Sequence, residues 1–233
     1  MNVSQKIHKF PRTPHLYWLS QTALRDDKVM SPPEAADFLN GEIIVEEKID
    51  GSNLGISLDR HRHVRAQNRG QFLRRPFTGQ WKPLAGWIAQ NRARIEEYLP
   101  ADVILFGEWC YLKHSILYTM LPDWFLGFDV FDLGTEQFWS VQRRNALCAT
   151  MELPVVAQIR RGGFTQMQLR AMLDRQSSYY SGPVEGLYLR KEGNDYVNSR
   201  AKLVRPEFVH SISEHWTRIP SQTNRCASFI LKE

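Results

Sequence analysis

The sequence predicts a single α+β domain spanning residues 1–233 and rich in antiparallel hairpins, and three observations lead to this fold class. A length of 233 residues with 42% hydrophobic residues is sufficient to bury a core. Short apolar segments bounded by glycine, asparagine and aspartate recur along the chain, which is typical of antiparallel strands. A few longer segments place apolar residues at helical spacing, and no repeat or linker interrupts the pattern.

Seven segments are predicted to be strands. They lie at residues 42–46, 53–58, 63–68, 102–109, 124–131, 184–190 and 196–204. The first two are expected to form a hairpin around the tight turn at Asp50–Ser52. The last two are expected to be joined by the turn at Gly193–Asp195.

Four segments are predicted to be helices. They are the stretch Leu84–Leu99, a segment that begins after Ser140, a segment that begins at Thr165 and the stretch Pro206–Thr217. Pro100 ends the first of them. Ser140 is a good N-cap residue, and Thr165 with Gln168 three positions later is typical of a capping box.

Several classes of protein are excluded by what the sequence lacks. No apolar run reaches the ~18–20 residues needed to cross a bilayer, and the first residues lack the apolar centre of a signal peptide. Three distant cysteines fit neither a disulfide framework nor a zinc site, which predicts a reducing, cytoplasmic location. There is no dinucleotide-binding, Walker or zincin motif. The histidines lack metal-ligand spacing, including His61, His63, His210 and His215.

The net charge of +5 is unevenly distributed. Nine Lys and Arg residues but no Asp or Glu lie between Arg60 and Arg94, whereas the rest of the chain has 21 basic and 25 acidic residues. The same segment contains four large aromatic residues, namely Phe72, Phe77, Trp81 and Trp87. Cations beside stacking aromatics indicate a nucleic-acid surface. The alternative is a solvated basic face whose aromatic residues belong to the core.

One octapeptide, Glu46–Asn53, combines residues that suit covalent chemistry. Lys48 is expected at the end of a strand, and the turn that follows presents backbone N–H groups and the side chains of Asp50 and Ser52. A lysine becomes a nucleophile when desolvation or a nearby cation removes its proton near neutral pH. Taken alone, the octapeptide fits a hairpin turn with a surface lysine better than a catalytic site.

Later segments favour the catalytic interpretation of Lys48, because they follow the lysine in a specific order. They are Asn68–Gly70, Phe106–Trp109, Phe128–Asp132, Glu185–Arg190 and Arg200–Val204. Together they resemble the motifs of the covalent nucleotidyltransferase superfamily, which comprises ATP-dependent DNA and RNA ligases and mRNA capping enzymes. The similarity is closest to the RNA ligase 2 branch, which includes nick-sealing RNA repair enzymes, and extends from about Glu42 to Val204.

This resemblance implies a ligase-type nucleotidyltransferase fold with antiparallel sheets flanked by helices and the nucleotide site between them. It also implies a reaction in three steps that uses ATP and a divalent cation, Mg²⁺ or Mn²⁺. Lys48 would take AMP from ATP and release pyrophosphate. Asp50 and Lys202 would be the other catalytic residues. The AMP would then move to the 5′-phosphate of a strand. A 3′-hydroxyl would finally attack this phosphate and release AMP.

The resemblance also implies a role for each further motif residue. Glu47 would recognise adenine, Phe128 would stack on it, and Arg69 and Glu108 would hold the ribose, with Arg65 as the alternative to Arg69. Glu185 would bind the metal, and Arg200 and Lys202 would contact phosphate, although the family usually has lysine where this chain has Arg200. Asn53 and Arg65 are expected to contact nucleic acid. Arg74 and Arg75 are expected to do so as well, as members of the basic stretch rather than of a motif.

Only 29 residues follow Val204, so no C-terminal OB-type domain is expected, only a helix and tail over 205–233. The basic stretch, or a partner protein, is expected to replace that domain. RNA is the expected substrate, but DNA and hybrid strands remain open, as does the choice between nicked duplexes and single strands. The alternatives are an adenylyltransferase that seals poorly without a partner, an ATP-dependent DNA ligase, and an inactive nucleic-acid-binding module.

Overall fold

The computed structural model describes residues 7–20, 28–211 and 222–227. The chain divides into two compact units. Unit 1 comprises residues 1–10, 51–112 and 122–155, and unit 2 comprises residues 11–50, 113–121 and 156–233. This division does not test the expected single domain, which stays a prediction.

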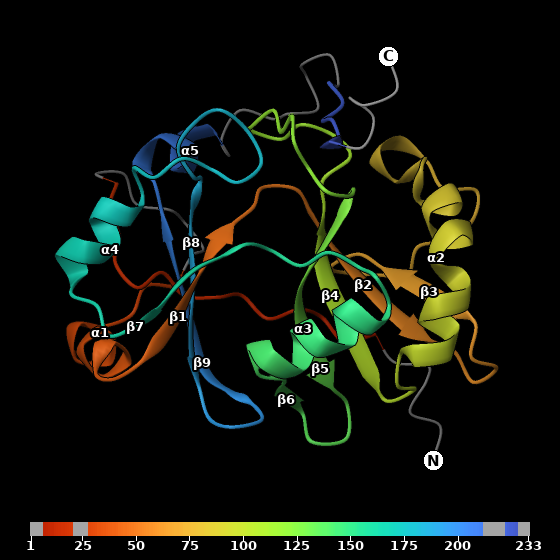
Figure 1. Ribbon diagram of the computed structural model, residues 1–233, viewed down its shortest axis with the longest axis horizontal. Coiled ribbons are helices and arrows are strands. Elements are labelled where there is room, and N and C mark those ends of the chain that lie inside the picture. The colour runs from red at the N-terminus through yellow and green to blue at the C-terminus, as the bar shows by residue number, and fades with distance from the viewer. Residues whose placement is uncertain (1–6, 21–27, 212–221, 228–233) are drawn as a thin grey trace. The chain divides into compact units, whose positions relative to one another are not determined.

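Unit 1 contains a five-stranded antiparallel sheet with the strand order β3-β2-β4-β5-β6, labelled in Figure 1. Its strands are β2 (Ser52–Leu58), β3 (Val64–Gln67), β4 (Val103–Trp109), β5 (Phe125–Asp132) and β6 (Gln137–Phe138). Its helices are the short 3₁₀ helix η2 (Gly79–Trp81), α2 (Leu84–Tyr98) and α3 (Val141–Thr150).

The two faces of the unit 1 sheet differ in what covers them. Leu54, Ile56 and Leu105 belong to a core that includes apolar residues of α2 and α3. Because side chains alternate along a strand, the residues between them face the other way. On that second face, a smaller apolar cluster forms around Phe10 and Phe106.

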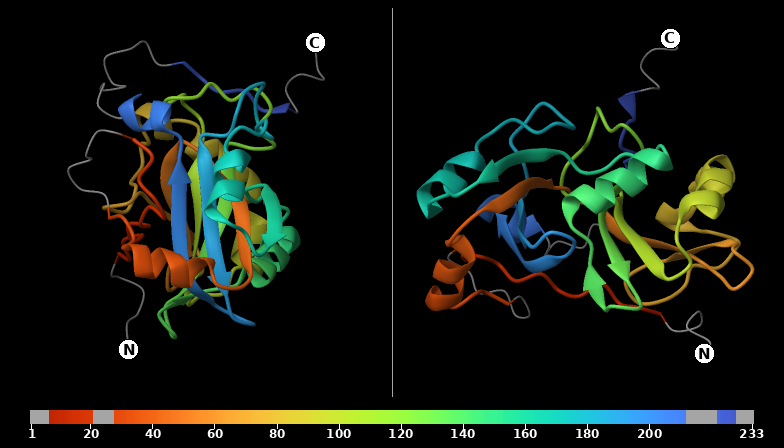
Figure 2. Two further views of the ribbon diagram at one scale, coloured as in Figure 1. Left: turned by 90° about the vertical axis from the view of Figure 1, so that its left-hand side faces the viewer. Right: turned by 60° about the horizontal axis from the view of Figure 1, so that its bottom comes forward.

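Unit 2 contains a four-stranded antiparallel sheet with the strand order β7-β1-β8-β9. Its strands are β1 (Ile43–Lys48), β7 (Gln158–Gly162), β8 (Gly186–Glu192) and β9 (Val197–Val204), and its helices are α1 (Pro32–Leu39), α4 (Gln166–Met172) and α5 (Pro206–Ser211). Apolar residues of α1 and α4 pack with those of β1, β8 and β9 in one core. Both helices lie in front of these strands in the left view of Figure 2.

The predicted strands are confirmed as strands, but the expected hairpin at Asp50–Ser52 is wrong. β1 pairs with β7 and β8, whereas β2 pairs with β3 and β4, so the segment at Asp50–Ser52 joins two different sheets. Residues 43–47 of β1 are all buried, as expected for a central strand with partners on both sides. Turn residues alone do not reveal such partners. The β8–β9 pairing agrees with expectation.

The helices largely agree with their sequence signals. α2 and α3 form where predicted, and Thr165 and Gln168 make the expected capping box at the start of α4. Ser140 precedes α3 but makes no side-chain cap hydrogen bond. α5 ends at Ser211, and the remainder of the stretch predicted up to Thr217 lies outside the described residues.

Helix α1 was not predicted, although its sequence carries a start signal. Ser31 and Glu34 form a complete capping box, and proline stands at the first helical position. Strands β6 and β7 were also missed, because β6 has two residues and β7 is largely exposed and polar. In the three described ranges, no helix has the length and apolar character needed to span a membrane. None of the three cysteines forms a disulfide bond, and all three are buried.

Candidate functional site

The centre of the candidate site in unit 2 is an ion pair between Lys48 and Glu185. Lys48 is the last residue of β1 and lies opposite Gly186 of β8 in the strand register. The Lys48 Nζ donates hydrogen bonds to both carboxylate oxygens of Glu185, at 2.6 and 2.8 Å. The Lys48 side chain is 24% exposed, whereas that of Glu185 is 5% exposed. The lysine therefore reaches solvent while its partner is buried.

Gly186 allows the backbone that carries Glu185 to approach β9 closely. A Cβ atom at Gly186 would lie 2.5 Å from the Leu203 carbonyl oxygen and 3.1 Å from the Val204 Cα. Both are backbone atoms of β9 and cannot move aside without distorting the sheet. Glycine at this position therefore keeps the strand pair, and with it Glu185, in place.

Burial determines the electrostatics of Glu185. Loss of solvation raises the pKa of this carboxyl to about 7, and the negative charge of Asp50 acts in the same direction. The positive charges of Lys48 and Lys202 oppose this rise. Glu185 is therefore a carboxylate poised between its two protonation states near neutral pH, with two lysines acting on it.

Asp50 is held in place by the segment 113–118. One of its carboxylate oxygens accepts a hydrogen bond from the Ser115 backbone N–H at 2.7 Å and another from the Ser115 hydroxyl. The Asp50 N–H donates to the Tyr118 hydroxyl at 2.9 Å. The His114 Nδ1 lies 4.0 Å from the other Asp50 oxygen, and burial lowers the pKa of this histidine. Sequence reasoning missed these residues, because nothing in their spacing links them to Asp50.

The two glutamates before Lys48 are both buried and both bonded. Glu47 accepts hydrogen bonds from the Ser177 hydroxyl and, at 2.9 Å, from the Ser178 N–H. Glu46 pairs with the buried Arg190 at 2.7 Å. The predicted role of Glu47 toward adenine is untested by these contacts, which show that its carboxylate also orders the loop before β8.

The unit 2 sheet presents one polar face. Ile43 and Val45 of β1 face the helices, so Glu46 and Lys48 face the other way. In the strand register, Lys202 lies in one row with Tyr188 and Glu46, and Arg200 lies in the neighbouring row opposite Arg190. The structure therefore places Lys48, Arg200 and Lys202 on the same face, with Glu185 bonded to Lys48.

In unit 1, Asn53 and Glu108 form a pair of directly opposed residues on β2 and β4. The Gly51 N–H donates to Glu108 at 3.0 Å. A Cβ atom at Gly51 would lie 2.7 Å from the Trp109 carbonyl oxygen, so this approach requires glycine. The Oδ1 atom of Asn53 is buried and has no hydrogen-bond partner within the described part of the chain. The Asn53 amide therefore has unused hydrogen-bonding capacity.

A β-bulge determines the direction of the Phe128 side chain. The register between β4 and β5 shifts after Phe106, and Phe128 is the extra residue on β5. Its ring packs edge to face against Phe10 at 5.2 Å, on the sheet face that also carries Asn53 and Glu108. Bulges commonly direct a side chain beside a functional site.

The two candidate ribose arginines differ in their surroundings. Arg65 lies on β3 opposite Ser57, on the same sheet face as Glu108, and its guanidinium stacks 4.3 Å above the Phe72 ring. Arg69 is exposed in the turn after β3, where the Asn68 side chain accepts hydrogen bonds from the N–H groups of Gly70 and Gln71.

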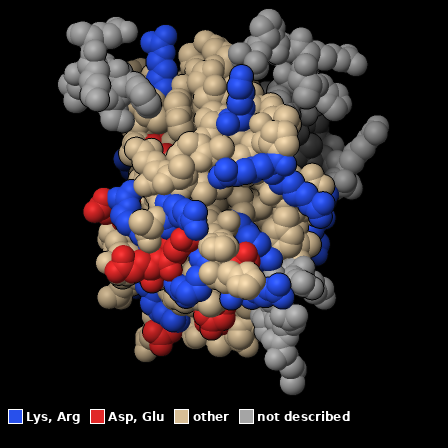
Figure 3. Space-filling view, turned by 90° about the vertical axis from the view of Figure 1, so that its right-hand side faces the viewer, with Lys and Arg blue, Asp and Glu red and all other residues tan. Residues whose placement is uncertain are grey.

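The basic stretch is partly neutralised in the folded chain. Arg92 pairs with Glu96, and Arg94 pairs with Glu152. Arg74 and Arg75 are exposed. The side of unit 1 that carries α2 and β3 shows many lysine and arginine side chains in Figure 3, with several aspartates and glutamates among them. Trp87 is buried and donates to Asp123 at 2.9 Å, so its inclusion in a nucleic-acid surface was wrong: it is a core residue.

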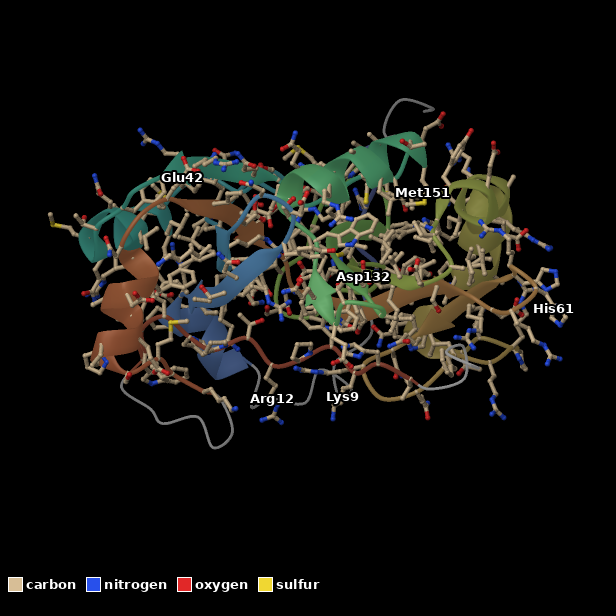
Figure 4. The ribbon with its side chains drawn as sticks, turned by 90° about the horizontal axis from the view of Figure 1, so that it is seen from below. Lys9, Arg12, Glu42, His61, Asp132 and Met151 are labelled. Atoms are coloured by element: carbon tan, nitrogen blue, oxygen red, sulfur yellow. The ribbon has the colours of Figure 1, made fainter. Side chains whose placement is uncertain are left out.

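No cluster of three or more metal-ligating side chains occurs among the residues that the structure describes. His61 and His63 lie on the exposed connection between β2 and β3, and Figure 4 shows His61 projecting from it. His215 lies outside the described residues, and the side chain of His210 is not described either.

Comparison with known proteins supports the family resemblance. A family model described as RNA ligase matches residues 41–204, close to the stretch in which the motifs were recognised. No curated protein matches the chain. A structure of the Naegleria gruberi RNA ligase, an apo mutant, has a TM-score of 0.65 and 18% identity, covering 88% of this chain and 57% of that one.

Two further structures of the same ligase give similar results. The structure with PPi has a TM-score of 0.62 and 18% identity, covering 90% of this chain and 61% of that one. A mutant with ATP and Mn has a TM-score of 0.63 and 19% identity, with coverages of 90% and 62%. At this identity the likeness shows the fold, and the chain spans about 57–62% of the length of these structures.

Proposed function

This chain belongs to the RNA ligase family, and we propose that it is an ATP-dependent polynucleotide ligase that joins RNA strands through a lysyl–AMP intermediate on Lys48. The observation that carries the proposal is the position of Lys48. It stands at the end of β1, partly exposed, bonded to the buried Glu185 and on one sheet face with Arg200 and Lys202. A lone surface lysine would not have these partners.

In the first step, the Lys48 amine attacks the α-phosphate of ATP. A bond forms between nitrogen and phosphorus, the bond to pyrophosphate breaks, and the amine loses a proton. Arg200 and Lys202 would neutralise charge on the phosphate, and positive charge nearby also favours the unprotonated amine. Because arginine binds phosphate without releasing a proton, Arg200 suits this role despite the family preference for lysine.

The residues present also fit a divalent cation. Mg²⁺ is usually held by one or two carboxylates together with substrate phosphates, so a cluster of three protein ligands is not required. Glu185 and the nearby Asp50 supply two carboxylates, and Ser115 fixes the second. A cation bound there would neutralise the phosphate charge during the displacements. Glu185 is the residue proposed to hold it.

Unit 1 is proposed to supply the residues for the nucleoside and the strand end. Asn53, Glu108, Arg65 and Phe128 share one sheet face, which supports Arg65 over Arg69 as the ribose contact. Phe128 would stack on adenine. The unsatisfied amide oxygen of Asn53 supports a polar ligand at this position, because buried polar groups normally have partners. Glu47 remains the proposed adenine contact of unit 2.

In the second step AMP moves from Lys48 to a 5′-phosphate, and in the third a 3′-hydroxyl attacks that phosphate and releases AMP. Both are in-line displacements governed by positioning and charge neutralisation. Arg74 and Arg75, both exposed and neither with a carboxylate partner in the described ranges, are proposed to contact the strand backbone.

A sealing assay tests this function and its alternatives. The chain is incubated with ATP and Mg²⁺ or Mn²⁺ and offered all-RNA, all-DNA and hybrid nicks as well as single strands with 5′-phosphate ends. Sealing of RNA ends supports an RNA ligase. Sealing of DNA alone would indicate a DNA ligase. Accumulation of adenylylated strands without sealing would indicate an adenylyltransferase, and GTP in place of ATP tests for capping chemistry.

The retained motif residues disfavour an inactive binding module, because Lys48, Glu185 and Lys202 would have no role in it. The comparisons offer no support for a partner protein. Assignment to the RNA ligase 2 branch, like the cytoplasmic location, stays a prediction.

A further inference from the structure

A groove of about 700 Å³ lies in unit 1, and residues 68–81 form most of it. Its lining includes Phe72, Arg74, Phe77, Thr78 and Trp81. Pockets of several hundred Å³ commonly hold ligands of nucleotide size. None of the residues assigned above to ATP lines this groove, but Arg65, the proposed ribose contact, stacks on the Phe72 ring at its wall.

Two aromatic rings of the groove are anchored in the core of unit 1 and remain partly exposed. Phe77 and Trp81 pack against the unit 1 core, and Trp81 stacks with the buried Trp109 at a centroid distance of 6.3 Å. Phe72, Phe77 and Trp81 are nevertheless only half-buried. Rings anchored in this way present a rigid apolar surface at little entropic cost.

The charge of the groove is positive. No acidic residue lines it, and Arg74 contributes a cation at its wall. Two further arginines lie over its rings: the Arg65 guanidinium is 4.3 Å from the Phe72 centroid, and that of Arg75 is 5.9 Å from the Phe77 centroid. A ligand here would therefore meet aromatic faces and cations together, which suits bases linked by phosphates.

We propose that this groove binds an unpaired stretch of the nucleic-acid strand, with bases stacked on Phe77 and its neighbours and phosphates on Arg74. Only unpaired bases expose their faces for such stacking, whereas a duplex offers mainly its backbone and groove edges. The inference rests on the proposed function and narrows its substrate: strands with single-stranded ends bind better than fully paired nicks.

The test measures binding of the full chain to a short single-stranded oligoribonucleotide and to a fully paired RNA duplex. Phe77→Leu keeps apolar volume but removes the aromatic face, and it should weaken single-strand binding roughly tenfold while changing duplex binding little. Phe164→Leu is the matched control, because Phe164 is a half-buried phenylalanine packed on the unit 2 core. Equal binding by the two variants would overturn the proposal.

A second pair of variants separates charge from stacking. Arg74→Ala should reduce the slope of log affinity against log salt by about 0.7 for the single strand, as expected for one lost phosphate contact. Arg160→Ala removes an exposed arginine of unit 2 and should leave the slope unchanged. Identical slopes for the two variants would contradict a phosphate contact at Arg74.

Photo-crosslinking keeps the proposal testable should Phe77→Leu fail to fold. A single strand carrying 5-iodouridine should crosslink the wild-type chain within residues 72–81. Crosslinks found only outside these residues would refute binding of the strand in the groove. Labelling of Lys48 by ATP is measured on the same preparations: normal labelling without groove crosslinks rejects this inference alone, whereas absent labelling rejects the proposed function.

Discussion

Lys48 donates hydrogen bonds to both carboxylate oxygens of Glu185. The Lys48 side chain is partly exposed, whereas that of Glu185 is buried. The two lie 137 residues apart in the sequence, and the pairing of β1 with β8 brings them together. This ion pair holds the Lys48 amine in one direction. It also compensates part of the cost of burying Glu185, because an unpaired buried carboxylate is strongly destabilised.

Glu185 should make stability depend on pH. Its pKa is about 7 in the folded chain, against 4.5 for the free group, so between these values the folded chain holds a proton that the unfolded chain releases. Its contribution to the free energy of unfolding is therefore fully present below about pH 4.5 and is lost as the pH rises through about 7. Relative to Glu185→Gln, the wild type should lose up to about 3 kcal/mol between pH 5 and pH 8.

Urea unfolding of both proteins at these two pH values measures this difference. A wild type that gains stability relative to Glu185→Gln over this range would contradict the assignment of a raised pKa to Glu185. The same variant should require ATP and metal at higher concentrations for labelling of Lys48, since the amide lacks the charge of the carboxylate.

Gly51→Ala should destabilise unit 1 by about 1–3 kcal/mol, because its Cβ would lie 2.7 Å from the Trp109 carbonyl oxygen. It should also lower the rate of Lys48 labelling, since the Gly51 N–H positions Glu108. Gly86→Ala is the control: Gly86 lies in helix α2 with nothing within 4 Å of its Cβ position. This change should stabilise by about 0.5–1 kcal/mol. Thermal unfolding compares the two variants, and equal effects would argue against the close approach at Gly51.

Ser115→Ala should slow Lys48 labelling several-fold, because Asp50 would keep the Ser115 N–H bond but lose the hydroxyl bond. The expected loss of stability is about 1 kcal/mol, as for a typical hydrogen bond. Ser178→Ala serves as control, since Ser178 contacts Glu47 through its backbone N–H, which the variant retains. Single-turnover labelling with ATP measures both rates. If Ser115→Ala labels Lys48 at the wild-type rate, the segment 113–118 does not support catalysis at the site.

Lys48→Arg should retain the ion pair with Glu185 and the fold, yet take no AMP, because a guanidinium does not become a nucleophile near neutral pH. If the later steps use other residues, the variant should still seal a strand that is adenylylated in advance. Lys48→Ala should also fail to label but should be less stable than Lys48→Arg, since it leaves Glu185 without its partner. Sealing of pre-adenylylated and ordinary strands by both variants, with unfolding midpoints, checks these outcomes.

Local sequence signals predicted the individual elements better than their partners. The capping box at Thr165 and the apolar spacing of α2 specify helices through neighbouring residues, and both were found as expected. The apparent hairpin at Asp50–Ser52 failed because strand pairing depends on residues far away, such as those of β8. Glycine there serves a close backbone approach rather than a tight hairpin.

The candidate site shows the same contrast between what local sequence signals predict and what depends on distant residues. Motif order identified Lys48 and Glu185, and the structure pairs them. The supporting contacts of Ser115 and Ser177 could not be foreseen, because each depends on a loop whose path the sequence does not specify. Trp87 shows the converse: basic neighbours in the sequence indicated a surface residue, whereas the apolar spacing of α2 directs it into the core.

The proposed function requires that Lys48 becomes covalently linked to AMP. The most direct measurement is mass spectrometry of peptides from the full chain after incubation with ATP and Mg²⁺ or Mn²⁺, kept at neutral or alkaline pH. One peptide should be heavier by the mass of one AMP, with the modification at Lys48 and absent from Lys48→Arg. An unmodified Lys48 in a chain that seals RNA, or AMP on a different residue, would contradict it.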